Sequence, residues 1–488
     1  MSASQQKKKR QSQPAGGQTP ARSGSRAPWI LGGIGAALLV VLAIFFAMVG
    51  SGFFQKHTTA AVAGSHKISP VMYNYFFQDA YYQSYASYVT DANTPLSQQY
   101  YDQEAGVTWA DYLQEQADSS IARTYALYDA AVADGYVLSE ADAAAVDAQL
   151  ETLSQTAASS GVSASAYLAG AYGQGANTEN FREYVELLQL TGSYLSAHAE
   201  SLEYSGEEIQ AYYEAHQDTL DTVSYRSFLC SVESDETDED GNPVIDGSAS
   251  EAMAREMAEA SQGSEETFSS LAYDNASESS KSYYEDDSAT LHSNQAVSEL
   301  SDSLRSWLTD PARQFGDTTA LEDESGGWTA VLFLDNASKY DVNVVNVRHI
   351  LIQPAGSEEA ASSAQALLDQ FLSGDQTEAS FAELARANSA DSNAAEGGLY
   401  ENVYPGQMVP AFNDWCFDAT RQPGDTGIVE TDYGYHVMYF VGEGGVTARE
   451  YRTVSAMQTE DTNAWADGLA SAVAVEHKGF GMRFTKLK

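Results

Sequence analysis

The pattern of apolar and polar positions opens with one long run that carries no charge. Residues 28–54 contain no charged side chain, and the segment from 29 to 49 reads WILGGIGAALLVVLAIFFAMV. A helix of this length can span a bilayer. Because the preceding flank is basic, the positive-inside rule places residues 1–27 in the cytoplasm. The run therefore predicts a single-pass anchor in the cell membrane with the bulk of the chain outside. The alternative, a cleaved signal peptide, usually has an apolar core of only about 7–15 residues.

Helical periodicity and capping signals dominate residues 60–220, which predicts a helical domain. Ser69 can cap a helix with aromatic residues around much of its circumference, and deep packing is the favoured interpretation. These residues are Tyr73, Tyr75, Phe76, Phe77, Tyr81, Tyr82, Tyr85 and Tyr88. The alternative, that some rings line a crevice for a bound chain segment, stays open. Further helices are predicted near residues 107–134, 139–158 and 178–200, and a capping box at 205–208 opens the last one.

Two later segments repeat each other, which predicts a duplicated domain over residues 221–340 and 341–445. WLTDPARQFGDT (307–318) aligns without gaps with WCFDATRQPGDT (415–426), so the offset between the two segments is constant. VSYRSFL (223–229) aligns with VNVRHIL (345–351), and GWTAVLF (327–333) with GYHVMYF (434–440). The alternation in these flanking segments is typical of strands. Each copy is thus expected to run from a strand through helices to a closing strand.

The two copies differ at positions that could carry chemistry. His349 in the second copy corresponds to Ser227 in the first, and His436 corresponds to Thr329. Only the second copy therefore has a histidine on each of two predicted core strands.

Composition narrows the classes of partner and cofactor. The chain has 488 residues with 69 acidic and 25 basic side chains and a formal net charge of −44, and the only charged residues in the segment 1–27 are basic. A chain with this much negative charge repels the phosphate groups of nucleic acids, which excludes nucleic acid as a partner. Cys230 and Cys416 are too few for a disulfide framework and leave a single bridge open. No Cys/His cluster indicates a metal site, and we expect neither a metal nor a cofactor.

An acidic segment at residues 233–247 faintly resembles a calcium loop. Gly247 stands where such a loop needs a bidentate Glu, so a solvated hairpin is the better interpretation.

Four motifs of the second copy occur in the order that is found in parvulin-type prolyl isomerases. They are VRHILI (347–352), FAELARANSADSNAAEGG (381–398), GQMVPAFNDWCF (406–417) and TDYGYHVMYF (431–440). On these motifs the second copy resembles the parvulin family from residue 347 to residue 440. The resemblance implies peptidyl-prolyl cis–trans isomerase activity and a half-barrel βα₃βαβ₂ fold with one antiparallel sheet.

The resemblance also assigns roles residue by residue. His349 and His436 look like the family's paired core histidines, and Asp391 occupies its acidic-or-cysteine position; these three are the expected catalytic residues. Met408 and Phe412 look like walls of the pocket that binds the substrate proline.

One segment departs from the family pattern. After the two glycines at 397–398, the usual Asp-Leu-Gly is replaced by Leu399, Tyr400 and Glu401, which bears on the shape of the pocket and on catalytic strength.

A wider resemblance covers the helical region. AVAGSHKISPVMYNYFF (61–77) looks like the opening of PrsA-like foldases and SurA-like chaperones. This implies a chaperone domain onto which residues 446–488 fold back, and unfolded or partly folded secreted proteins with X-Pro bonds as partners. No cysteine follows the apolar run to carry a lipid, so the transmembrane helix would replace the lipid anchor of the PrsA-like pattern.

The expected fold class is therefore α+β, with a transmembrane helix, a helical chaperone domain and two tandem parvulin-like domains. Two functions compete: a membrane-tethered isomerase, and a non-catalytic holdase whose parvulin-shaped modules only grip chain segments. The absence of a Gly-x-Ser-x-Gly elbow and of His-Glu-x-x-His disfavours a hydrolase. A homodimer through the helical domain stays open.

Overall fold

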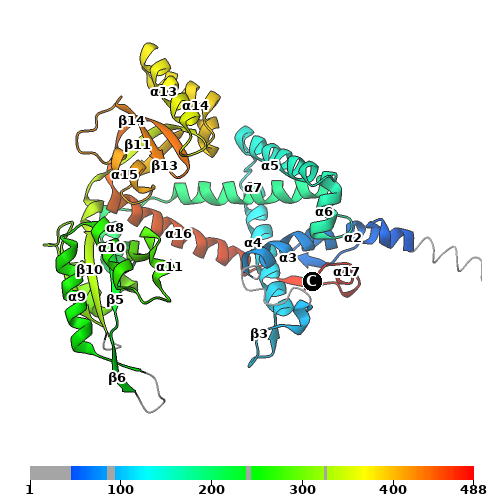
Figure 1. Cartoon of the computed structure of the whole chain (residues 1–488). Coiled ribbons are helices and arrows are strands. Elements are labelled where there is room, and N and C mark those ends of the chain that lie inside the picture. The colour runs from blue at the N-terminus through cyan, green and yellow to red at the C-terminus, as the bar shows by residue number, and fades with distance from the viewer. Residues whose placement is uncertain (1–45, 85–93, 238–242, 324–326, 488) are drawn as a thin grey trace, which may run out of the picture. The chain divides into compact units, whose positions relative to one another are not determined.

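The computed structural model describes residues 46–84, 94–237, 243–323 and 327–487. The chain divides into two compact units, one formed by residues up to 198 together with 463–488 and the other by residues 199–462 (Figure 1). The predicted cytoplasmic tail and most of the predicted anchor lie outside the described residues. Among the residues that are described, no helix combines the length and apolar character needed to cross a membrane.

The first unit is mainly helical. Its elements are α2 (Phe53–His57), β1 (Ala61–Ala63), β2 (His66–Ile68), α3 (Pro70–Ser84), η1 (Leu96–Gln98), β3 (Tyr100–Asp102), β4 (Val107–Thr108), α4 (Trp109–Ala133), α5 (Glu140–Ser159), α6 (Ala164–Tyr172), α7 (Thr178–Ser201), β15 (Val475–His477) and α17 (Gly479–Met482). Capping boxes start two of the helices: Thr108 with Asp111 for α4, and Ser139 with Asp142 for α5. Each box satisfies backbone N–H groups that the first turn leaves without partners.

Helix α3 lies at the centre of this unit. Its fully buried aromatic residues, each at most 1% exposed, are Tyr73, Tyr75, Phe76 and Phe77. This part of the helix has the deep packing that its aromatic pattern predicts. Tyr82, near the end of α3, is instead 56% exposed, and Tyr85 and Tyr88 lie outside the described residues.

The C-terminal residues complete a small sheet in the same unit. β15 pairs antiparallel with β1, which brings His477 opposite Ala61, and β2 pairs with the other side of β1.

The second unit contains two four-stranded antiparallel sheets with the same topology. The first copy has β5 (Thr222–Cys230), β8 (Leu291–Ala296), β9 (Thr318–Glu322) and β10 (Trp328–Asp335), in the order β8-β5-β10-β9. The second has β11 (Asn343–Ile352), β12 (Leu399–Val403), β13 (Thr426–Thr431) and β14 (Gly434–Thr447), in the order β12-β11-β14-β13. The registers agree as well, because Ser227 pairs with Val331 as His349 pairs with Met438. Sequence offsets and strand pairing thus describe the same duplication.

Helices connect the strands of each copy. In the first copy they are α9 (Gly247–Ser261), α10 (Glu265–Asn275), α11 (Lys281–Tyr284), η2 (Asp287–Thr290), η3 (Val297–Glu299) and α12 (Asp302–Leu308). In the second they are α13 (Glu358–Ser373), α14 (Glu378–Asn388), η5 (Ser392–Glu396) and α15 (Pro410–Cys416). The second copy therefore has the element order βα₃βαβ₂, with one 3₁₀ turn, η5, as its third helix. Helix α8 (Gly206–Leu220) precedes the copies, η4 (Ala337–Asp341) joins them, and α16 (Ala448–Ala470) follows.

Alternation along the strands gives the second sheet two different faces. Ile350 and Val437 point to a cluster with residues of α13 and α14. Val347 and Met438 point to a second cluster, which includes Phe412 of α15. Figure 1 shows α13 and α14 on one side of this sheet and α15 on the other. Because side chains alternate along a strand, His349 and His436 face the α15 side.

The acidic segment forms a two-stranded hairpin of β6 (Glu233–Thr237) and β7 (Pro243–Ile245), and the residues between the strands lie outside the described part. No group of metal-ligating side chains occurs among the described residues. Cys230 and Cys416 are both free and buried, so the single bridge that the sequence left open is not formed.

Candidate functional site

Two histidines meet between the central strands of the second sheet. Leu351 lies opposite His436 in the register of β11 and β14, so His349 and His436 are diagonal neighbours on the same face. Their Nδ1 atoms lie 3.0 Å apart and their rings are near parallel, with centroids 5.2 Å apart. One Nδ1 must donate and the other accept, which couples the tautomers of the two rings. His436 Nε2 lies 2.8 Å from Thr431 Oγ1 on β13, which fixes the outer end of the pair.

A carboxylate approaches the inner histidine. Asp391 caps η5, accepts a hydrogen bond from the backbone N–H of Asn393, and places its Oδ2 3.4 Å from His349 Nε2. Burial strongly lowers the pKa of His349, and the neighbouring Asp391 carboxylate opposes that effect without cancelling it. Burial also lowers the pKa of His436. Both rings are therefore neutral near pH 7, beside an acidic group that is only partly buried.

Glycines bring this carboxylate to the strand. A Cβ at Gly398 would lie 2.0 Å from the carbonyl oxygen of His349, so only glycine permits the approach. His349 N–H donates to the Gly398 carbonyl at 2.8 Å. Arg348 holds the same segment, since its guanidinium donates to the carbonyl oxygens of Glu396 and Gly397 and to the carboxylate of Glu378. The Gly-Gly pair and Arg348 together place η5, and with it Asp391, against the histidines.

Helix α15 supplies an apolar wall. Phe412 is 3% exposed and stands edge-on to His349 and His436, with ring centroids 5.5 and 5.3 Å away. Met408, in the loop before α15, is half-buried and packs in the same hydrophobic cluster as Phe412. The structure thus brings four of the five expected site residues into direct proximity and places Met408 at the edge of their cluster.

Tyr400 is a site residue to which sequence reasoning gave no role, although its segment departs from the family pattern. Its ring stacks on His349 with centroids 5.1 Å apart, and its hydroxyl lies 3.3 Å from Asp391 Oδ1. It pairs with Val347 across β11 and β12, which puts it on the face that carries His349. Burial, and then the Asp391 carboxylate, raise the pKa of Tyr400, so its hydroxyl stays protonated and donates to the carboxylate.

The first copy has a different arrangement at the same place. Ser227 Oγ lies 2.8 Å from Nε2 of His292, a residue of β8 that stacks on Tyr225 with centroids 4.5 Å apart. Tyr225 is buried in a cluster with Leu300 and Leu308. A large side chain therefore fills this face of the first sheet, where the second copy has the smaller Val347.

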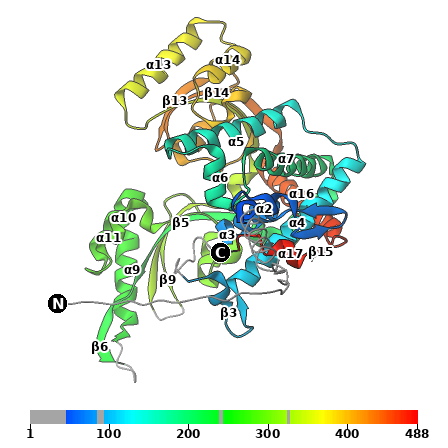
Figure 2. The same ribbon diagram turned by 90° about the vertical axis from the view of Figure 1, so that its right-hand side faces the viewer.

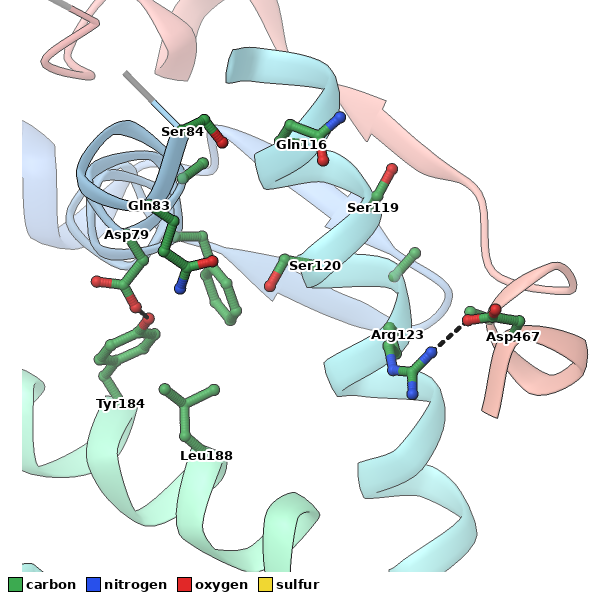
Figure 3. A pocket seen from close by; sticks show the side chains of 14 residues that line it. Asp79, Gln83, Ser84, Gln116, Ser119, Ser120, Arg123, Tyr184, Leu188 and Asp467 are labelled. Carbon is green, nitrogen blue, oxygen red and sulfur yellow. Dashed lines mark hydrogen bonds and ion pairs between the residues drawn. The ribbon is translucent and has the colours of Figure 1, made fainter. Parts of the chain in front are cut away.

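A separate pocket of about 570 Å³ lies in the first unit. Figure 3 shows Asp79 of α3 and Tyr184 of α7 on one side of it and Arg123 of α4 on the other. Asp79 accepts a hydrogen bond from the Tyr184 hydroxyl, and Arg123 pairs with Asp467. Burial raises the pKa of Asp79, with the Tyr184 hydrogen bond opposing. The side chains of α4 that line the pocket are mainly polar. Phe76 of α3 and Leu188 of α7 add apolar lining.

Comparison with known proteins matches residues 333–442 to the family model of the PPIC-type PPIase domain. These residues include all five of the expected site positions. The second copy is a parvulin-type PPIase domain. Its two histidines, Asp391, Met408 and Phe412 are thus residues of one domain of known type.

Two curated relatives extend the likeness. The chain is 31% identical over 166 residues to the chaperone SurA of Alkalilimnicola ehrlichii, covering 33% of this chain and 36% of that protein. It is 31% identical over 115 residues to the foldase protein PrsA 1 of Listeria innocua, covering 23% of this chain and 36% of that protein. The match thus spans about a third of the length of each relative.

Among solved structures, the crystal structure of PrsA from Bacillus subtilis aligns with 75% of this chain and 87% of its own, at 13% identity and a TM-score of 0.32.

Proposed function

We propose that this protein is a peptidyl-prolyl cis–trans isomerase that acts on unfolded or partly folded secreted proteins. The observation that carries the proposal is the neutral pair of His349 and His436, packed against Phe412 with the Asp391 carboxylate 3.4 Å from one ring. The SurA and PrsA relatives, a chaperone and a foldase by name, support the class of client.

The reaction needs no nucleophile. An X-Pro bond isomerises over a barrier of about 18–20 kcal/mol because amide resonance must be broken, and this takes tens to hundreds of seconds uncatalysed. An apolar wall such as Phe412 and Met408 holds the pyrrolidine ring and excludes water. A site that favours the twisted amide over the planar one then accelerates the exchange.

Asp391 supplies the electrostatic part of that preference. Twisting an amide reduces delocalisation, so the carbonyl oxygen loses negative charge. A carboxylate near that oxygen therefore destabilises the planar ground state more than the twisted transition state. The substrate carbonyl is proposed to lie beside the partly exposed face of Asp391.

The histidines organise the site rather than transfer protons. Their pKa values are lowered by burial, and cis–trans isomerisation moves no proton. Their shared Nδ1 hydrogen bond fixes the floor on which Phe412 and Tyr400 pack.

Exchange NMR of a short X-Pro peptide with the full chain tests this proposal. We expect acceleration by the wild type and its loss in the Asp391→Ala, His349→Ala double variant. Ser227→Ala, at the position in the first copy that corresponds to His349, is the matched control and should leave the rate unchanged. A folded wild type that accelerates none of several X-Pro peptides would refute the enzyme and leave the holdase.

A holding activity is the second candidate. It is favoured by the pocket of about 570 Å³ in the helical unit and by the first copy, which has Ser227 and Thr329 in place of the histidines. Suppression of aggregation of an unfolded client should survive the double variant at 349 and 391 and should fall in Leu188→Arg, which places a charge in the pocket wall. Sedimentation of the same samples distinguishes a monomer from a homodimer.

We also propose that residues 28–54 tether the protein to the cell membrane with the bulk outside. The support is the uncharged, strongly apolar run at 29–49 behind a basic flank. Protease treatment of intact cells should digest everything after the anchor, and alkaline carbonate should leave the protein in the membrane fraction. Release by carbonate would refute the tether.

A further inference from the structure

Two segments without acidic residues stand out in this acidic chain. Residues 46–78 and 478–488 contain no Asp or Glu, although the whole chain has 69. Their basic residues are Lys56, Lys67, Lys478, Arg483, Lys486 and Lys488, the last of which lies outside the described residues. The two segments come from opposite ends of the sequence, so their shared charge pattern gains meaning only if the fold brings them together.

The fold does bring them together. β15 pairs with β1, and α17 then turns so closely against the chain before β1 that a Cβ at Gly481 would lie 1.8 Å from the Thr59 carbonyl oxygen. Phe54 of α2 stacks on Phe484, with ring centroids 5.0 Å apart, and stands edge-on to Phe480 of α17. Figures 1 and 2 both show α17 next to α2. These contacts hold α2 and α17 against each other within the first unit.

Both segments expose an apolar ring and a cation. Phe53 is 40% exposed and Phe480 is 58% exposed. Lys56 and Arg483, on the same two short segments, are also exposed. We call these four residues the Phe–Lys surface.

We propose that the Phe–Lys surface docks on the headgroup region of an anionic phospholipid bilayer. Exposed Phe rings can bury into the boundary between headgroups and acyl chains, and Lys and Arg are attracted to anionic lipid. All 69 acidic residues lie within positions 79–476, and this part of the chain is repelled by such a surface, so the charge pattern also orients the first unit. A bilayer is the expected partner because the apolar run at 29–49, the proposed membrane anchor, ends a few residues before Phe53. The inference rests on the proposed tether and adds a second contact, made by the C-terminal end of the chain.

A lipid-quenching experiment tests the contact on the full chain in nanodiscs. A Cβ placed on Gly479 would have nothing within 4 Å, so Gly479→Cys gives a reporter position beside Phe480 that tolerates a side chain. Ser154→Cys on α5, exposed in the same unit, is the matched control. The buried native cysteines are left unlabelled. A fluorophore on each introduced thiol is quenched by lipids brominated in the upper acyl chain, in discs with and without phosphatidylglycerol.

We expect at least threefold stronger quenching at 479 than at 154 in anionic discs. The Lys56→Glu, Arg483→Glu variant should lose most of that difference, and so should discs of phosphatidylcholine alone, whereas Lys281→Glu in the other unit should change nothing. Equal quenching at the two positions in disc-bound protein, or no effect of charge reversal and lipid charge, would overturn the docking surface. Protein that fails to co-elute with the discs would instead refute the tether. Isomerase activity, measured on the same samples, is independent of both outcomes.

Discussion

Tyr400→Phe tests how charge at Asp391 controls the isomerase. The change removes one hydroxyl and keeps the ring that stacks on His349. The hydroxyl lies 3.3 and 3.5 Å from the two carboxylate oxygens, beyond the usual O–H···O range. A good hydrogen bond to a charged group contributes about 1.5–3 kcal/mol, so this long one should contribute about 1 kcal/mol. Without it the carboxylate repels a planar substrate carbonyl more strongly.

The expected result is therefore a faster enzyme. A change of about 1 kcal/mol corresponds to roughly a fivefold rate, so kcat for an X-Pro peptide at saturating concentration should rise by up to about fivefold, with a parallel rise in KM. Asp391→Asn, which keeps the shape and removes the charge, should lower kcat. The double variant should match Asp391→Asn, because the hydroxyl acts through the carboxylate. If Tyr400→Phe slows the reaction and its effect adds to that of Asp391→Asn, the hydroxyl contacts the substrate and the reasoning is wrong.

Three further outcomes are expected. Because burial lowers the pKa of His349, the unfolded state binds a proton at a higher pH than the folded state does. The domain should therefore keep its stability above about pH 6.5 and lose it as the pH falls from there toward the lowered pKa. Denaturant unfolding at pH 7.5 and pH 5 measures this loss, and His349→Gln should make the free energy of unfolding less dependent on pH. Asn294→Ala should raise KM severalfold with little change in kcat, because Asn294 donates to the Gly406 carbonyl at 3.0 Å in the loop before Met408; an unchanged KM would contradict this. Burial raises the pKa of Cys230 to about 11 and of Cys416 to about 12, so a thiol reagent at pH 8 should modify neither until the chain is unfolded.

The sequence predicts the helices and strands of this chain well where periodicity and capping agree. The strand predicted at 223–229 is β5, Thr222–Cys230, and the helix predicted near 139–158 is α5, Glu140–Ser159. Helix α6, Ala164–Tyr172, was not predicted. It is short, and a helix of nine residues depends on packing more than on its own propensity.

The site geometry was less accessible from sequence than its residues. Family motifs point to His349 and His436, but the 3.0 Å contact of their Nδ1 atoms depends on the register of β11 and β14. The role of Tyr400 depends on a ring orientation that no local pattern encodes. The position of His292 could have been predicted from the sequence. The offset that aligns position 307 with position 415 also aligns His292 with Tyr400. The strand pairing agrees, because His292 pairs with Tyr225 as Tyr400 pairs with Val347.

The two copies show which contacts the fold requires and which serve only the site. Arg226 Nε donates to Glu265 at 2.9 Å, as Arg348 Nε donates to Glu378 at 2.9 Å. Each arginine also donates to the segment before the edge strand, Arg226 to the backbone carbonyl of Asp287 and Arg348 to those of Glu396 and Gly397. Loss of these acceptors would leave an arginine with little or no access to water unpaired, which is strongly destabilising, so these contacts serve the fold of both copies.

The strand order of the sheet does not depend on the histidine pair. A serine–histidine contact and a buried tyrosine occupy the same face of the first sheet, and that sheet closes with the same strand order. The same strand order therefore forms with different side chains on this face. This difference between the copies supports the proposal that His349, His436 and Asp391 serve the reaction rather than the fold, and that the second copy alone is catalytic.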